Sequence, residues 1–194
     1  MECPKPIKPD VVRLETPRLI LRRFEISDAE EMYANWANDP EVTRYMIWTT
    51  HPNVEHSREI LSKWVEGYRD NTCFNWAIEF KPEKTLVGSV GGDFMDPLIF
   101  SFGYCLSRAY WGRGIVPEAA RAMIAYVFDN TNVNRIEAFH DPENSKSGRV
   151  MQKCGMILEG TLRQCLFTSN RGISDRVTYS ILREDYERMR QPGA

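Results

Sequence analysis

The sequence predicts a single mixed α/β domain, and three features of the chain support this fold class. Apolar residues recur at helical spacing in two early segments, residues 27–38 and 53–69. Short β-prone runs separated by turn residues then occupy residues 74–106. A loop containing two glycines leads from the last of these strands into a third helix, at about residues 115–128. Helices and strands alternating in this way favour helices packed on one sheet.

Composition excludes several other classes of protein. The chain has 194 residues, 42% of them hydrophobic and 27% charged, which suits one globular domain. Its net charge of −2 provides no basic surface for nucleic acid. No apolar run approaches the ~20 residues of a membrane span, and the N-terminus has no signal-peptide core. We therefore expect a cytoplasmic protein with neither nucleic acid nor membrane as a partner.

The cysteines and histidines predict neither a metal site nor a disulfide framework. The five cysteines are odd in number, and no two have Cys-x-x-Cys spacing. His51 and His56 are five residues apart, whereas a pair of helical metal ligands is spaced by four.

The domain begins with a strand and a helix. Residues 1–10 carry three prolines and predict an extended or loose tail before a domain at 11–190. Residues 18–24 have a strand pattern. Ser27, with Glu30 three residues later, predicts a capping box at the start of a helix. The Asn-Asp-Pro sequence at 38–40 ends that helix.

A second helix and three strands follow. Residues 45–52 are rich in aromatic residues and contain a proline, which favours a covering loop. The apolar spacing at 53–69 predicts an amphipathic helix. Strands at 74–80, 86–94 and 99–106 are separated by turns, so they form an antiparallel meander that ends at the glycine loop.

The last third of the chain adds a strand, a short helix and a hairpin. Residues 135–140 read as a largely buried strand. Asn144 or Ser145 caps a short helix that Gly155 ends. Strands at 157–167 and 177–182 form a final hairpin, and a short charged helix follows it.

The glycine loop at residues 112–114 is a candidate phosphate site. Unpaired backbone N–H groups at a helix N-terminus bind anions, and Arg108 and Arg113 add positive charge. A plain strand-to-helix turn would use the same residues. Pro117 stands where a dinucleotide fingerprint needs its third glycine, and no P-loop sequence is present, so these two better-known loops are excluded.

The block around this loop resembles the acetyl-CoA loop of the GNAT superfamily of N-acetyltransferases. Tyr-Trp-Gly-Arg-Gly at 110–114, followed by Glu118-Ala119, is similar to the branch that acetylates ribosomal-protein N-termini (RimJ/RimL-like). The first position of the signature is Ala109 here, with an arginine one residue earlier. Asn-x-x-Ser at 144–147 and the segments 15–19 and 39–42 extend the resemblance over most of the chain.

The resemblance implies a fold and a cofactor site. The implied fold is a mostly antiparallel seven-stranded sheet, splayed between its fourth and fifth strands and flanked by about four helices. The cofactor is acetyl-CoA, with the pantetheine arm beside residues 105–107 and the pyrophosphate on the amides of 109–115. The implied cofactor-binding residues are Cys105, Leu106, Ser107, Arg108, Ala109, Trp111, Gly112, Arg113, Gly114, Ile115, Asn144 and Ser147.

Acetyl transfer requires a polarised carbonyl, a neutral amine and a proton for the departing thiolate. The N–H of Leu106 is our oxyanion donor, and Ser147 is our leading proton donor. A serine in a first helical turn more often bonds to backbone. Tyr104 is a second candidate acid, although a strand aromatic is more often part of a core.

The acceptor side is less defined by the sequence. Tyr45 and Trp48 are candidates for the acceptor pocket, because the connection between the first helices lines it in related enzymes. Asp93 is a candidate in the same pocket and, with Asp96, a candidate base acting through water. Each of these two aspartates is also a typical turn residue.

We therefore expect direct transfer of acetyl to a primary amine in a ternary complex, without a covalent enzyme intermediate. A protein N-terminal amine is one acceptor, and a polyamine, antibiotic or amino acid is the alternative. A CoA-binding sensor without catalysis is a second class of function, and a nucleotide-binding module is disfavoured. No metal is expected, and the chain is a monomer or homodimer.

Overall fold

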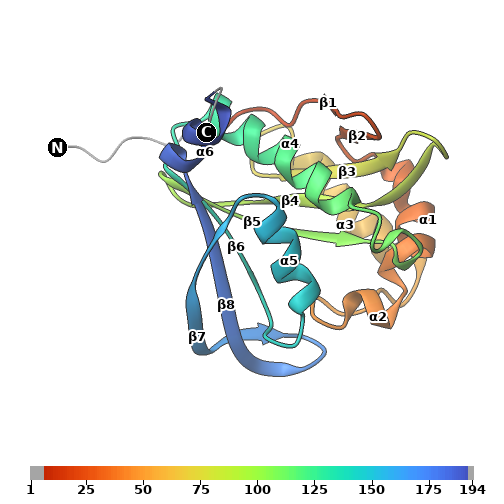
Figure 1. Ribbon diagram of the computed structural model, residues 1–194. Helices are drawn as coiled ribbons and strands as arrows, with labels where there is room; N and C mark the ends of the chain where they lie inside the picture. Colours follow the sequence, from red (N-terminus) through yellow and green to blue (C-terminus); the bar gives the residue numbers. More distant parts are fainter. Residues whose placement is uncertain (1–6, 192–194) are drawn as a thin grey trace.

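The computed structural model describes residues 7–191 and contains one open sheet of eight strands (Figure 1). The strand order is β1-β2-β3-β4-β5-β6-β8-β7, and every neighbouring pair is antiparallel except β5 and β6. The strands are β1 (Leu14–Glu15), β2 (Leu19–Arg22), β3 (Phe74–Phe80), β4 (Thr85–Asp96), β5 (Ile99–Leu106), β6 (Arg135–His140), β7 (Ile157–Thr168) and β8 (Gly172–Leu182). The α-helices are α1 (Ala29–Met32), α2 (Pro40–Thr43), α3 (Val54–Gly67), α4 (Ile115–Asn130), α5 (Ser145–Lys153) and α6 (Arg183–Arg190).

The predicted fold class is confirmed, with small differences in the number of elements. The eighth strand is β1, whose two residues pair with Leu21 and Ile20 at the sheet edge. The described residues form six α-helices where about four were expected, because two of them are single turns of four residues. None of the helices within residues 7–191 is both long enough and apolar enough to cross a bilayer.

The tail predicted at residues 1–10 lies partly outside the described residues, which begin at Ile7. Residues 7–10 have no secondary structure but are held against the domain at two points. The backbone N–H of Ile7 donates to the side chain of Asn132, and Tyr126 donates to the carbonyl of Asp10. This part of the tail is therefore extended and anchored, not loose.

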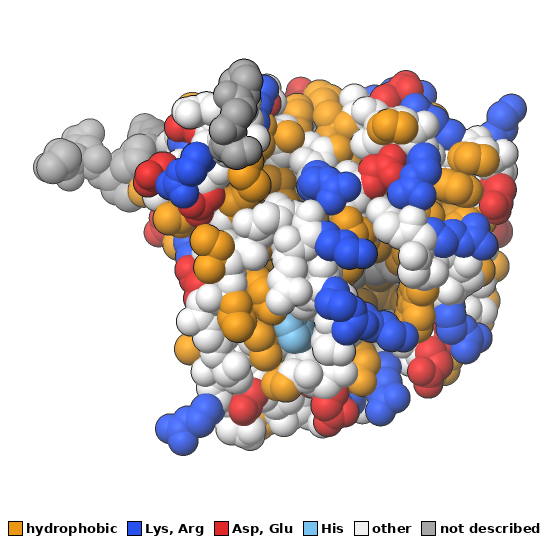
Figure 2. Space-filling view, in the orientation of Figure 1, with side chains coloured by type: hydrophobic (Ala, Val, Ile, Leu, Met, Phe, Trp, Pro, Cys, Tyr) orange, Lys and Arg blue, Asp and Glu red, His pale blue; other side chains and the backbone are white. Residues whose placement is uncertain are grey.

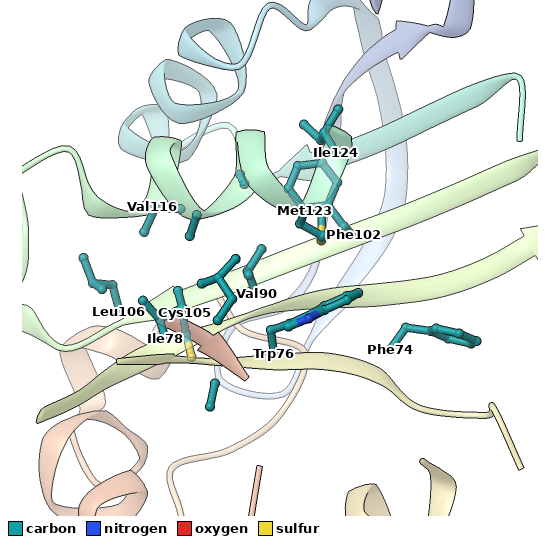
Figure 3. Packing of buried hydrophobic residues seen from close by; sticks show 14 of the residues in the cluster. Phe74, Trp76, Ile78, Val90, Phe102, Cys105, Leu106, Val116, Met123 and Ile124 are labelled. Atoms are coloured by element: carbon teal, nitrogen blue, oxygen red, sulfur yellow. The ribbon is translucent and has the colours of Figure 1, made fainter. Parts of the chain in front are cut away.

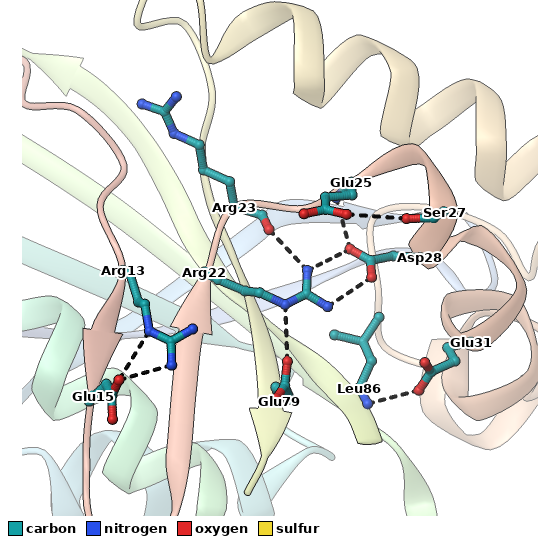
Figure 4. A network of polar contacts seen from close by, with 10 residues as sticks. All are labelled: Arg13, Glu15, Arg22, Arg23, Glu25, Ser27, Asp28, Glu31, Glu79 and Leu86. Carbon is teal, nitrogen blue, oxygen red and sulfur yellow. Dashed lines mark hydrogen bonds and ion pairs between the residues drawn. The ribbon is translucent and has the colours of Figure 1, made fainter. Parts of the chain in front are cut away.

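The first helical segment begins earlier than the sequence predicts. A 3-10 turn (Ile26–Asp28) precedes α1, and a π-helical turn (Tyr33–Ala37) follows it. The capping box joins Glu25 and Asp28, not Ser27 and Glu30, and the Glu25 N–H donates to the Asp28 carboxylate over 2.8 Å. Arg22 of β2 also donates to both carboxylate oxygens of Asp28 (Figure 4). This contact holds Asp28 where it can accept the N–H of Glu25, which makes Glu25 the N-cap residue.

The sheet is covered on both faces. Helices α4 and α5 lie on one face and α1 and α3 on the other (Figure 1). Val116 and Met123 of α4 point toward the strands (Figure 3). Among the side chains with no exposed surface are Trp36 and Trp76, which lie in the core of the described residues. Burial of this extent is the main stabilising term for the domain.

The two central strands separate, and this separation positions the site. β5 pairs with β6 only through residues 99–101 and 135–137. Beyond Ser101, β5 stays paired with β4 while β6 stays paired with β8. The ends of β5 and β6 therefore diverge. The resemblance predicts this splay between the fourth and fifth strands of a seven-stranded sheet, which are β5 and β6 here because β1 is an additional strand.

The final hairpin is longer than expected. β8 begins at Gly172, five residues before the predicted start, and the turn between β7 and β8 covers only residues 169–171. The extra pairs join Leu166–Thr168 to Gly172–Ser174. The tip of this hairpin reaches the segment that follows α2, since Asn170 donates to the carbonyls of Thr43 and Trp48.

Candidate active site

A cleft of about 680 Å³ opens where β5 and β6 diverge. It is bounded by the end of β5, the glycine loop, the first turn of α4, helix α5 and the segment 41–46. Figure 2 shows a hollow on this face of the molecule, with Lys and Arg side chains gathered around it. Of the predicted site residues, Tyr45, Tyr104, Cys105, Leu106, Trp111, Gly112, Gly114, Ile115, Asn144 and Ser147 line the cleft.

The backbone of Leu106 faces the gap between the strands. Ser107 donates its N–H to Val87 on β4 over 2.7 Å. Because antiparallel backbones alternate in direction, the N–H and C=O of the preceding Leu106 point away from β4. The indole of Trp111 donates to that carbonyl over 2.8 Å, while no partner is found within residues 7–191 for the Leu106 N–H. A donor is thus exposed in the cleft.

The glycine loop has the geometry of an anion site. Gly112 and Gly114 have φ of +77° and +74°, values that side chains other than glycine rarely adopt. Gly114 is the N-cap of α4, and its left-handed backbone turns the chain into the helix. The amides of residues 112–116 have no hydrogen-bond partner within the described residues, so the loop presents a group of free N–H donors at a helix N-terminus.

Two distant sequence blocks hold this loop in place. Glu118, in the first turn of α4, accepts hydrogen bonds from the Thr16 hydroxyl (2.6 Å) and from the backbone and side chain of Arg18. Arg18 also donates to the carbonyl of Arg113 over 2.9 Å. Burial alone would raise the pKa of Glu118, but these hydrogen bonds outweigh it and lower that pKa. Residues 16–18 therefore anchor the loop to β2.

The two loop arginines are engaged elsewhere. Arg108 forms an ion pair with Asp39 over 3.1 Å. Arg113 lies 3.8 Å from Glu83 and over the ring of Tyr110. Neither arginine is among the residues that line the cleft, and Ala109 and Ser107 are also outside that set. The positive charge expected from these two arginines is thus partly neutralised by carboxylates.

Ser147 and Asn144 face the cleft from the start of α5. Neither side chain has a hydrogen-bond partner within the described residues, and Asn144 caps the helix without a side-chain bond. Tyr104 donates its hydroxyl to the backbone carbonyl of Ser147 over 2.9 Å. Burial raises the pKa of Tyr104, an effect that this hydrogen bond opposes only in part. The phenol is therefore protonated at neutral pH, and its proton is directed at Ser147.

Of the three residues predicted for the acceptor pocket, only Tyr45 is among the residues that line the cleft. The guanidinium carbons of Arg44 and Arg171 lie over the Tyr45 ring, 5.3 and 5.0 Å from the ring centroid. Trp48 packs against the core and is not among the lining residues. Asp93 is exposed on β4, opposite Ser101, and the structure does not bring it to the cleft.

Asp96 serves the turn between β4 and β5. Its carboxylate accepts the backbone N–H of Leu98 over 3.0 Å. Like Asp93, it is not among the residues that line the cleft. Neither aspartate is therefore positioned beside Ser147 or Leu106.

Several charged lining residues were not predicted from the sequence. Two carboxylates line the cleft, those of Glu41 and Glu143. Glu143 pairs with Arg171, whereas no partner is found for the Glu41 carboxylate within residues 7–191. The lining cations are Arg44, Lys146, Arg149 and Lys153. Three of these cations recur on α5 at spacings of three and four, a pattern that was visible in the sequence as one face of the helix.

The thiols near the site are unreactive. Burial raises the pKa of Cys105 to about 11 and that of Cys154 to about 11, so both are protonated at neutral pH. Cys105 contacts the Ser89 hydroxyl over 3.1 Å. In the described part of the chain, the cysteines are free, and no group of three or more His, Cys, Asp or Glu side chains could hold a metal ion.

Comparison with known proteins assigns this arrangement to a family. The model of the acetyltransferase (GNAT) domain matches residues 18–157. The chain is 33% identical to the uncharacterized N-acetyltransferase p20 of Bacillus licheniformis, over 89% of this chain and 97% of that protein. It is 26% identical to the ribosomal protein uS5-alanine N-acetyltransferase of Escherichia coli, over 80% of this chain and 83% of that protein.

Solved structures agree with this assignment. The crystal structure of a GNAT-family acetyltransferase from Bacillus anthracis superposes with a TM-score of 0.79 at 28% identity, over 89% of this chain and 99% of that chain. The divergent strands, the glycine loop and the Asn-x-x-Ser sequence at the start of α5 all fall within the matched region. The chain therefore belongs to the GNAT family and is an N-acetyltransferase.

Proposed function

We propose that the chain transfers acetyl from acetyl-CoA directly to a primary amine in a ternary complex. The observation that carries this proposal is the cleft itself, which combines the free N–H of Leu106, the free amides of residues 112–116 and the unpartnered hydroxyl of Ser147. Acetyl-CoA would supply the thioester. A pantetheine arm beside the end of β5 would place its carbonyl near Leu106 and its pyrophosphate on the loop.

The reaction forms one C–N bond and breaks one C–S bond. The neutral amine attacks the thioester carbonyl, and the Leu106 N–H stabilises the negative charge that develops on the oxygen. As the intermediate collapses, the Ser147 hydroxyl, or a water held by it, gives a proton to the CoA thiolate, and the proton that the nitrogen loses restores that donor through water. Tyr104 holds the backbone of Ser147 in place through its hydrogen bond. The protonated thiols of Cys105 and Cys154 support direct transfer, since neither is a nucleophile.

Glu41 is the carboxylate that we place opposite the acceptor amine. It lines the cleft and, unlike Glu143, has no cationic partner in the described residues. An unpaired carboxylate favours an ammonium substrate and accepts its proton, directly or through water. Glu41→Gln should raise the KM for the amine at least several-fold and leave the Kd for acetyl-CoA unchanged in calorimetry. An unchanged amine KM would remove Glu41 from the acceptor site.

For the acceptor, we propose the N-terminal amine of a protein. The Escherichia coli relative is named as an alanine N-acetyltransferase of ribosomal protein uS5. The test is a screen that measures free thiol released from acetyl-CoA, with alanine- and serine-initiated peptides beside polyamines, aminoglycosides and amino acids. Release with small amines and not with peptides would contradict the peptide acceptor and leave the acetyltransferase assignment intact.

Cofactor binding is tested first, by thermal unfolding with saturating acetyl-CoA, CoA or NAD. A ligand at ~100 times its Kd adds about 2.7 kcal/mol to the free energy of unfolding, which raises the midpoint by roughly 5–10 °C for a chain of this length. We expect a shift with acetyl-CoA and CoA and none with NAD. The absence of any shift with acetyl-CoA would mean that the glycine loop is only a turn.

A further inference from the structure

A row of cations on α5 faces the cleft without carboxylate partners. Lys146, Arg149 and Lys153 lie three and four residues apart, so they project from one side of the helix. All three line the cleft and are exposed. Within residues 7–191 none of them forms an ion pair. Figure 2 shows Lys and Arg side chains following α5 along the edge of the hollow. We call these three residues the α5 cation row.

The row contrasts with the loop arginines. Arg108 and Arg113 have carboxylate neighbours in Asp39 and Glu83. Like charges one turn apart on a helix are destabilising when nothing neutralises them. The α5 cation row is therefore the part of the cleft where an anionic ligand gains most by binding.

The two ends of the row lie at different parts of the cofactor cleft. At the inner end, the Lys146 ammonium lies 5.0 Å from the ring of Trp111, next to the glycine loop. At the outer end, the Lys153 carbonyl accepts a hydrogen bond from Arg121 of α4 over 2.9 Å. Seven residues of helix separate them, or roughly 10 Å at 1.5 Å per residue. The row thus runs from Trp111, at the glycine loop, to the first two turns of α4, where Cys154 also contacts the carbonyl of Pro117.

CoA carries its phosphates in a matching order. Its pyrophosphate follows the pantetheine arm, and its third phosphate is a monoester on the 3′ position of the ribose, beyond the pyrophosphate. With the pyrophosphate on the loop, the ribose would lie beyond it, within reach of Arg149 and Lys153, which line the same cleft. A phosphate monoester has a charge approaching −2 at neutral pH, so it is a stronger partner for these cations than either phosphate of the pyrophosphate.

We propose that Arg149 and Lys153 form a recognition site for the ribose 3′-phosphate, with which the chain selects CoA over 3′-dephospho-CoA. Lys146 at the inner end then serves the pyrophosphate. This inference rests on the proposed use of acetyl-CoA and adds the feature of the donor that the site distinguishes.

The test measures the Kd of acetyl-CoA and of acetyl-3′-dephospho-CoA by isothermal titration calorimetry. The wild type should bind acetyl-CoA roughly tenfold or more tightly than the dephospho form, the ratio expected for charge-assisted hydrogen bonds to one phosphate. The double variant Arg149→Gln/Lys153→Gln should lose this preference and bind both ligands with the Kd that the wild type has for the dephospho form.

The control is Lys63→Gln/Arg69→Gln, which removes the same charges from exposed positions, one within α3 and one two residues after its end. It should keep the wild-type preference, which separates local recognition from net charge. Equal Kd values for the two ligands in the wild type would overturn the inference, as would equal weakening of both in the Arg149/Lys153 variant. If the wild type binds neither ligand, the proposed function fails together with the inference.

Discussion

The hydroxyl of Ser147 has no hydrogen-bond partner among residues 7–191, although a serine in the first turn of a helix commonly bonds to nearby backbone. Its backbone, by contrast, is fixed from two sides. The N–H donates to the carbonyl of Asn144, and the carbonyl accepts from Tyr104. A side chain left free on a fixed backbone is typical of a group that acts on a ligand.

Ser147→Ala should therefore lower kcat by about 10²-fold, the lower range for loss of a general acid, and leave the Kd for acetyl-CoA nearly unchanged. The measurement is thiol release at saturating acetyl-CoA, with calorimetry for binding. Ser62→Ala is the control, because Ser62 is an exposed serine of α3 that does not line the cleft and donates to the carbonyl of Arg58 in its own helix. Equal turnover in Ser147→Ala and the wild type would make Ser147 a structural residue.

At the scale of elements, the glycine loop depends on its attachment to β2. Arg18 joins Glu118 of α4 and the carbonyl of Arg113, so it holds both sides of the turn at Gly114. Arg18→Ala should raise the Kd for acetyl-CoA roughly tenfold, because charge-assisted bonds that fix the loop are lost, while kcat at saturation stays close to wild type.

The control for that variant is Arg13→Ala, which removes an exposed arginine paired with Glu15 at the same sheet edge. It should leave both parameters unchanged. A lower kcat with an unchanged Kd in Arg18→Ala would show that Arg18 does not act through the phosphate loop.

The tip of the β7–β8 hairpin closes over the acceptor side of the cleft. Asn170 donates to the carbonyls of Thr43 and Trp48, and Ser169 donates to that of Ile47. These bonds fix the segment that carries Tyr45. Asn170→Ala should raise the KM for the amine roughly 2- to 10-fold, the effect of losing neutral hydrogen bonds, without changing the Kd for acetyl-CoA.

Asn130→Ala is the matched control, since Asn130 donates to the carbonyl of Tyr126 in its own helix, at the C-terminus of α4. Its KM for the amine should equal that of the wild type. If Asn170→Ala weakens acetyl-CoA binding and leaves the KM for the amine unchanged, the hairpin tip positions the acetyl-CoA site and not the amine site.

The sequence predicts the strands well where the local pattern alone determines them. β3, β5 and β6 occupy the predicted residues, because β3 alternates apolar and polar side chains and β5 and β6 are short β-prone runs. The first helix was placed two residues late. Ser27 satisfies the local capping pattern, but Arg22 on the neighbouring strand binds Asp28 and makes Glu25 the cap.

The backbone of the site was also predictable, whereas its charges were not. Leu106, the two loop glycines and Ser147 line one cleft, and their roles toward acetyl-CoA stay a prediction from the resemblance. The resemblance does not indicate that Arg108 is paired with Asp39, a contact between residues 69 positions apart. Which cations remain free depends on such long-range pairs, and these are set by the tertiary fold.

At the scale of the whole molecule, stability depends on a histidine buried away from the cleft. His51 is 6% exposed, and its Nδ1 lies 2.8 Å from the hydroxyl of Ser57. The rings of Trp48 and His56 pack against it. Burial, with a smaller contribution from the charge of His56, lowers the pKa of His51 to about 4. In the folded protein the ring is therefore neutral down to that pH.

The unfolded chain binds a proton at this position below about pH 6.5, whereas the folded protein does so only below about pH 4. The unfolded state thus binds more protons in this window, so the free energy of unfolding falls as the pH is lowered from 6.5 to 4. The full loss is on the order of 3 kcal/mol at most. Thermal or urea unfolding measured across this range gives the slope directly.

His51→Asn removes the titrating ring and keeps a hydrogen-bonding atom near the position of Nδ1. The carboxylates titrate in both proteins, so their contribution cancels when the two pH profiles are subtracted. The difference in unfolding free energy between wild type and His51→Asn should shrink progressively from pH 6.5 to 4. His56→Asn, at a more exposed ring, should retain most of the wild-type slope. Parallel profiles for the wild type and His51→Asn would mean that His51 is protonated equally in both states and that acid lability arises elsewhere.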